Sequence, residues 1–105
     1  MAESLVVVLS RPSTRLLEGR EQRMELRLHP HAKERAAERG ATEEEVIATV
    51  REGERFPAKF GRTGFRRNFP LDGEWRGRPY RTKQIEAFAV EEDGWLVITV
   101  VVRYF

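Results

Sequence analysis

The chain of 105 residues contains no cysteine. This absence excludes disulfide bridges, thiolate metal sites and cysteine nucleophiles, so packing has to stabilise the fold. Long apolar runs are also missing. The longest covers residues 96–102, contains Thr99, and is far shorter than the roughly 20 residues that span a bilayer. No basic leader precedes the apolar residues 5–9, and we therefore expect a cytoplasmic protein without a membrane segment.

Several signatures of catalysis and cofactor binding are missing as well. The sequence has no phosphate-binding loop, no dinucleotide glycine fingerprint and no serine nucleophile elbow. Its two histidines are His29 and His31, but Pro30 and the two-residue spacing prevent both rings from sharing one helix face. The sequence therefore predicts neither a bound metal nor another cofactor.

Length and composition predict one small globular domain. A chain with 40% hydrophobic and 34% charged residues can form one core beneath a charged surface, and 105 residues are too few for two cores. Residues 1–23 resemble an N-terminal extension that contains a short strand at residues 5–9. Residues 24–105 are predicted to form a single α+β domain.

The net charge of +2 is unevenly distributed along the chain. Between Lys59 and Lys83 there are eight basic and two acidic residues, so this segment carries +6 and the remainder −4. Arginine outnumbers lysine 16 to 3, and its planar guanidinium group suits bidentate contact with phosphate. The distribution favours a nucleic-acid partner, although an arginine excess is equally typical of a GC-rich genome or of heat adaptation.

Local signals predict two helices in the first half of the domain. Pro30 is typical of a first helical turn and Gly40 of a left-handed helix end, so a short helix is expected from about Pro30 to Arg39. Thr42 and Glu45 have the spacing of a capping box. A second helix is therefore expected to start there and to end at Gly53.

The rest of the domain has the patterns of strands. Residues 24–28 alternate between apolar and polar, short strands and turns follow the second helix, and residues 80–91 and 95–105 are expected to form a hairpin. In the last strand Leu96, Ile98, Val100, Val102 and Tyr104 are predicted to face one way and Trp95, Val97, Thr99, Val101, Arg103 and Phe105 the other. Both faces are apolar, which indicates a central strand. We expect two short N-terminal helices on an antiparallel sheet of about four strands, with a homodimer or the extension covering the second face.

The first helix carries a row of residues that could act on phosphate. His31, Arg35 and Arg39 are spaced by four and share one helix face. The two arginines are expected either to bind phosphate or to pair with carboxylates such as Glu38 or Glu86. His31 is either a general base or a structural residue that caps the helix or packs with a hydrogen bond.

The basic middle of the chain contains further residues that could contact a nucleic acid. Trp75 lies in a loop with no strand face to fill, so it is expected to be an exposed contact, whereas the phenylalanines are expected to be core residues. The predicted nucleic-acid-binding residues are Arg39, Arg62, Arg66, Arg67, Trp75, Arg76 and Arg78.

The motif His31-Ala32-x-x-Arg35-x-x-x-Arg39-Gly40, followed by Thr42-x-x-Glu45-Val46, resembles the bacterial family called domain of unknown function 4258. The resemblance covers about residues 28–105. That family is similar in element order to the RelE and BrnT toxins, small ribonucleases with two N-terminal helices on an antiparallel sheet. The resemblance implies a RelE-like fold, cleavage of RNA by attack of a ribose 2′-hydroxyl on the adjacent phosphate, and an antitoxin-like partner protein.

A cleavage of this kind needs a base, an acid and groups that stabilise the phosphorane charge. We assign His31 as the base, Arg35, Arg81 and Lys83 as charge stabilisers, and either Tyr104 or a protonated partner as the acid. The motif supports the positions on the first helix, whereas Arg81, Lys83 and Tyr104 are chosen for their chemistry and strand placement. Two further hypotheses are a non-catalytic nucleic-acid-binding module and a protein-interaction domain.

Overall fold

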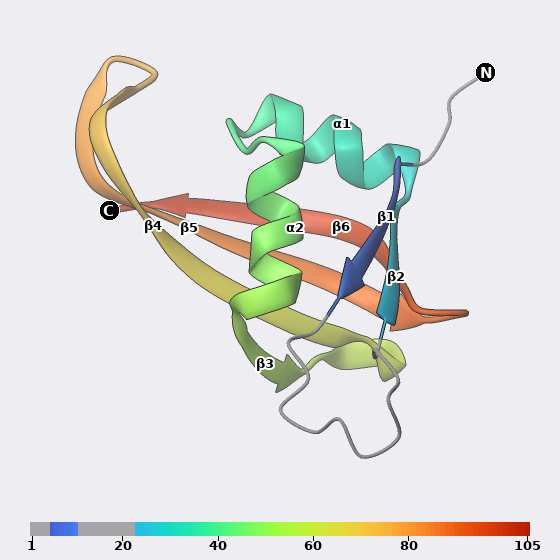
Figure 1. The fold of residues 1–105 in the computed structure, drawn as a ribbon. Helices are drawn as coiled ribbons and strands as arrows, with labels where there is room; N and C mark the ends of the chain where they lie inside the picture. Colours follow the sequence, from blue (N-terminus) through green and yellow to red (C-terminus); the bar gives the residue numbers. More distant parts are fainter. Residues whose placement is uncertain (1–4, 11–22) are drawn as a thin grey trace.

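The computed structural model describes residues 5–10 and 23–105, with side chains described from Glu25 onward. The protein is an α+β domain in which two helices cover one face of a twisted sheet (Figure 1). The elements in chain order are β1 (Leu5–Ser10), β2 (Arg23–Leu28), α1 (Pro30–Glu38), α2 (Glu43–Glu52), β3 (Glu54–Pro57), the 3₁₀ turn η1 (Lys59–Gly61), β4 (Thr63–Trp75), β5 (Arg78–Glu91) and β6 (Trp95–Tyr104). None of the helices in the described part of the chain has the length and apolar character needed to cross a membrane.

The sheet is mixed and, within the described residues, has six strands in the order β1-β2-β6-β5-β4-β3. Every neighbouring pair is antiparallel except β2 and β6, which run parallel. The α+β prediction is therefore confirmed, but the prediction of an antiparallel sheet of about four strands is wrong. The helices are also not N-terminal, because β1 and β2 precede them in the chain. The strand expected at residues 5–9 is β1, which pairs with β2 along its whole length.

Both helices begin and end where the sequence predicts. Pro30 occupies the first position of α1, and the imidazole Nδ1 of His29 accepts a hydrogen bond of 3.0 Å from the backbone N–H of His31. The capping box of α2 is complete, because Thr42 and Glu45 each bond the backbone N–H of the other at 3.0–3.1 Å. These local contacts satisfy backbone donors that a helix start leaves free.

The core lies between the helices and the sheet. α1 packs on β6, while α2 packs on β5 and β4. The helices contribute small or branched residues, which allow close approach to the strands. The buried residues of the core include Ala32, Ala36, Val46 and Val50 from the helices and Leu26, Leu28, Ile85, Ala87, Ala89, Val97 and Val100 from the sheet.

β6 contains an irregularity that changes which of its residues face the core. Thr99 pairs with Phe88, but the next residue of β5 pairs with Val97, so Ile98 is an extra residue in β6. Trp95 and Val97 are consequently buried together with Val100. The predicted strict alternation along this strand is wrong for its first half, because the bulge shifts the pattern by one residue. The prediction of a central strand is confirmed, since β6 lies between β2 and β5.

Candidate functional site

A cavity of about 360 Å³ opens at the C-terminal end of α1. We call it the arginine cavity, because three of its side chains are guanidinium groups. It is formed by the end of α1, the tip of the β4–β5 hairpin and the last residues of β6. Its lining residues are Arg35, Glu38, Arg39, Trp75, Arg76, Val102 and Tyr104.

The fold brings these residues together from three distant segments. The α-helical period places Arg35, Glu38 and Arg39 on neighbouring positions of the last turns of α1. The long β4–β5 hairpin curves back toward the end of this helix (Figure 1). Its tip residue Arg76 donates a long hydrogen bond of 3.4 Å to the backbone carbonyl of Glu38. Three segments thus surround one recess.

Two stacked aromatic rings form part of the wall of the arginine cavity. Trp75 and Tyr104 are stacked, with ring centroids 5.0 Å apart and planes inclined by 14°. Gly40 lies directly against both rings with a φ of +84°, and a Cβ there would be 2.5 Å from the Tyr104 hydroxyl. Gly40 is therefore needed both for its left-handed backbone and for the space that its missing side chain leaves. Trp75 is half-buried, in contrast to the predicted exposed contact.

Tyr104 uses its hydroxyl to hold the helix end. The hydroxyl donates a hydrogen bond to the backbone carbonyl of Arg39. Burial, together with the nearby carboxylate of Glu45, raises the pKa of Tyr104, while Arg76 lowers it by a smaller amount. Tyr104 is therefore protonated and already engaged as a donor at neutral pH, and a raised pKa makes it a weaker acid for a leaving group.

The cationic groups of the cavity are only partly neutralised. Arg35 donates from Nε to the Nε2 atom of His31 at 3.3 Å and from Nη1 to Glu38 at 3.3 Å. Arg39 donates from Nη1 to the carbonyl of Val100 at 2.7 Å. A guanidinium group has five N–H donors, so each retains donors for a ligand. Among the described residues, Glu38 is the one acidic side chain that lines the cavity, against three arginines, so the described lining has an excess of positive charge.

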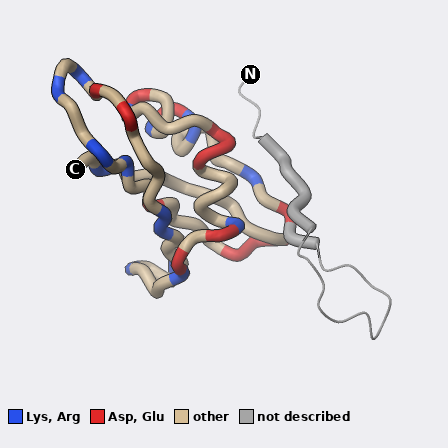
Figure 2. Tube along the Cα trace, turned by 60° about the vertical axis from the view of Figure 1, so that its left-hand side comes forward, with Lys and Arg blue, Asp and Glu red and all other residues tan. Residues whose placement is uncertain are grey.

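The charge distribution extends this positive region along the hairpin. Figure 2 shows basic positions at the β4–β5 tip and near the C-terminus on the same end of the molecule. Arg78 and Arg81 are exposed on this hairpin but do not line the cavity. They add to the local positive potential without a direct place in the recess.

Several basic residues predicted for the site are instead bound to carboxylates elsewhere. Lys83 is 8% exposed and contacts Glu45 at 2.7 Å and the carbonyl of Gly40 at 2.9 Å. It attaches the loop after α1 and the start of α2 to the sheet. Arg67 pairs with Glu52 at 2.6 Å. The structure does not bring either residue to the arginine cavity.

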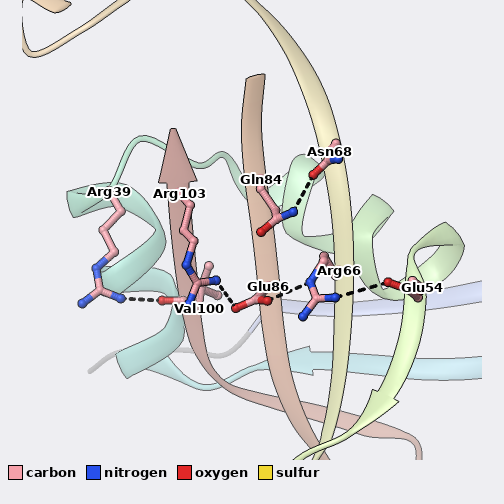
Figure 3. A network of polar contacts seen from close by, with 8 residues as sticks. All are labelled: Arg39, Glu54, Arg66, Asn68, Gln84, Glu86, Val100 and Arg103. Atoms are coloured by element: carbon pink, nitrogen blue, oxygen red, sulfur yellow. Dashed lines mark hydrogen bonds and ion pairs between the residues drawn. The ribbon is translucent and has the colours of Figure 1, made fainter. Parts of the chain in front are cut away.

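Arg66 belongs to a separate network on the sheet (Figure 3). Its Nε donates to Glu86 at 2.8 Å, and Arg103 donates to the other oxygen of the same carboxylate. Glu86 is only 5% exposed. Burial alone raises the pKa of Glu86, but the hydrogen bonds and charges of Arg103 and Arg66 outweigh it and hold the pKa below its usual value. The predicted pairing of α1 arginines with Glu86 is thus wrong, whereas that of Arg35 with Glu38 is present.

The remaining predicted residues lie outside the cavity. His31 is exposed at the start of α1, one turn from the recess, and reaches it only through its contact with Arg35. Arg62 lies beside Phe60 at the η1 turn. No group of three or more metal-ligating side chains occurs among the described residues. Val102 was missed by sequence reasoning, because nothing in a strand pattern shows which residue borders a recess.

Comparison with known proteins adds no family or relative. No protein-family model, no curated protein and no solved structure matches this chain. The resemblance to domain of unknown function 4258, and through that family to the RelE and BrnT toxins, therefore stays a prediction.

Proposed function

We propose that this protein binds single-stranded RNA and that a phosphate group of the RNA occupies the arginine cavity. The convergence of Arg35, Arg39 and Arg76 on one recess carries this proposal. Guanidinium groups form short, charge-assisted hydrogen bonds with phosphate oxygens. Partial enclosure between α1 and the hairpin strengthens such bonds relative to an open surface.

The size of the cavity favours a single strand over a duplex. A volume of about 360 Å³ admits one nucleotide-sized group. The backbone of single-stranded RNA is flexible enough to place one phosphate in a recess, whereas a duplex presents its phosphates on a rigid convex surface. Glu38 adds a reason to favour RNA over DNA, because its carboxylate can accept a hydrogen bond from a ribose 2′-hydroxyl.

RNA cleavage in the manner of a RelE-like toxin is the second candidate. It is favoured by the position of His31, whose Nε2 lies 3.3 Å from Nε of an arginine of the cavity. A general base and a phosphate site would then adjoin each other. Binding without cleavage is preferred because Tyr104, assigned as the acid, has a raised pKa and donates to Arg39.

Fluorescence anisotropy with labelled single-stranded RNA tests the proposal. Arg35→Gln removes one guanidinium group from the cavity, and Arg51→Gln removes the same charge from the exposed end of α2. A charge-assisted hydrogen bond contributes about 1.5–3 kcal/mol, so Arg35→Gln is expected to weaken RNA binding roughly tenfold or more. Arg51→Gln is expected to change it less than about twofold.

The same samples separate the alternatives. DNA of the same sequence is expected to bind more weakly than RNA. Equal effects of the two glutamine substitutions would show that only overall charge matters and would contradict the cavity as the binding site. If gel analysis shows that the wild-type protein shortens the RNA and His31→Ala does not, the ribonuclease hypothesis replaces binding alone.

A further inference from the structure

The η1 turn between β3 and β4 contains an exposed phenylalanine whose backbone conformation is unusual. Phe60 is 85% exposed and has a φ of 62° and a ψ of 36°. Gly61 follows with a φ of +70°, and the backbone N–H of Arg62 donates to the carbonyl of Lys59 at 3.2 Å to close the turn. The ring therefore stands at the tip of a tight turn.

Neither the backbone nor the packing of this turn favours phenylalanine. Two successive residues with positive φ are typical of turns that contain asparagine or aspartate followed by glycine. A phenylalanine in this conformation costs about 1–2 kcal/mol, and an exposed ring gains little from burial in return. Unfavourable backbone conformations that folding does not explain occur preferentially at binding sites. The turn at residues 59–62 therefore points to a ligand.

The chemistry around the ring indicates what the ligand is. Lys59 and Arg62 flank Phe60, and the guanidinium carbon of Arg62 lies 5.9 Å from the ring centroid. The sequence contains no acidic residue from position 55 to position 71. Within the described part of the chain, neither flanking cation forms an ion pair. An exposed ring between two cations suits an unpaired nucleobase next to its phosphates.

The surroundings of Phe60 argue against a protein partner. Protein interfaces depend on clusters of aromatic and aliphatic residues that exclude water together. Among the described side chains, the only other large hydrophobic residue that is exposed is Phe105, at the end of the chain that follows β6. Phe60 is thus an isolated ring rather than the centre of an apolar patch.

We propose that Phe60 stacks on an unpaired base of the RNA whose phosphate occupies the arginine cavity. This base belongs to a different nucleotide of the same strand. This inference rests on the proposed RNA binding. β4 begins beside η1 and ends at Trp75 in the cavity. Its 13 residues have a contour length of roughly 40 Å, and because the strand curves, the two sites are closer to each other than this length (Figure 1). Only an RNA long enough to cover the distance between the two sites reaches both.

Binding of RNAs of two lengths tests this inference. Single-stranded RNAs of about 4 and about 16 nucleotides are titrated against the wild type, Phe60→Leu and Phe60→Trp. Phe60→Leu keeps an apolar side chain but removes the aromatic face, so it is expected to weaken binding of the long RNA about tenfold and to leave the short RNA unchanged. Phe60→Trp is expected to bind the long RNA at least as tightly as the wild type does.

Matched variants distinguish the possible failures. Phe105→Ala removes the other exposed phenyl group and is expected to leave both affinities unchanged. Arg35→Gln is expected to weaken the binding of both the short and the long RNA. Retention of long-RNA affinity by Phe60→Leu would overturn the stacking site while leaving the cavity intact. Absence of RNA binding by the wild type would overturn both proposals.

Discussion

Glu86 shows how a single carboxylate organises one face of the sheet. It points away from the helices, because its neighbours Ile85 and Ala87 are both buried in the core. Arg66 and Arg103 approach its two oxygens from the adjacent strands (Figure 3). A buried carboxylate is tolerated only when such partners compensate for its lost hydration. The triad therefore joins β4, β5 and β6 side by side.

The lowered pKa of Glu86 predicts how stability depends on pH. In the unfolded chain the carboxylate binds a proton at a higher pH than in the folded protein, so its contribution is present above the unfolded pKa and is lost as the pH falls through the folded pKa. Urea unfolding is expected to show a loss of stability below about pH 4.5 in the wild type. The Glu86→Gln variant is expected to be less stable than the wild type at pH 7. Below about pH 4.5 its free energy of unfolding is expected to fall less steeply than that of the wild type. Glu54→Gln, which removes an exposed carboxylate, is expected to keep the wild-type pH dependence.

Gly40 provides a second prediction about a single residue. A Cβ at this position would lie 2.5 Å from the Tyr104 hydroxyl and 2.6 Å from the Trp75 ring, and the backbone has positive φ. Gly40→Ala is therefore expected to lower the free energy of unfolding by about 2–4 kcal/mol, the sum of backbone strain and overpacking. Gly61 also has a positive φ, but a Cβ added there would meet no other atom. Gly61→Ala is therefore expected to lower the free energy of unfolding by only about 1 kcal/mol. Equal losses in the two variants would contradict the packing described for the helix end.

At the scale of elements, the β4–β5 hairpin is the part that creates the site. Its turn residues Arg76 and Gly77 have φ values of 53° and 82°, as a two-residue turn with both central residues left-handed requires. Asparagine is the preferred residue at the first of these positions. The guanidinium group of Arg76 instead lies over Trp75, 5.2 Å from its ring centroid, and lines the arginine cavity.

Arg76→Asn is therefore expected to separate stability from binding. The substitution relieves the unfavourable backbone conformation and is expected to raise the melting temperature slightly, by a gain of about 0.5 kcal/mol. It also removes one guanidinium group, so RNA affinity is expected to fall about fivefold or more, by a greater factor than in Arg51→Gln. Anisotropy and thermal unfolding measure the two effects. A variant that lost stability and kept its affinity would contradict the role given to this turn.

The predictability of each element depends on how local its determinants are. The helix starts could be predicted because Pro30, Thr42 and Glu45 act within one turn of the chain. The bulge at Ile98 could not, because it depends on the pairing between β5 and β6. Alternation within one strand contains no information about an extra residue relative to its neighbour.

At the scale of the whole molecule, the sheet order is the feature that sequence reasoning could not supply. The parallel contact of β2 with β6 joins residues about seventy positions apart. The same long-range packing decides which basic residues are free to bind. Arg35 and Arg39 could be placed together by helical spacing, whereas the carboxylate partners of Lys83 and Arg66 become visible only when the strands and helices are assembled.

The most direct test of the arginine cavity is the salt dependence of RNA binding. Each phosphate contact of a single-stranded nucleic acid contributes a slope of about −0.7 to the logarithm of the association constant against the logarithm of the salt concentration. Wild-type protein and Arg35→Gln are titrated with the same RNA over a series of salt concentrations. The slope is expected to become shallower by about 0.7 in Arg35→Gln. An identical slope in both proteins, or RNA binding that is insensitive to salt, would contradict a phosphate held by this cavity.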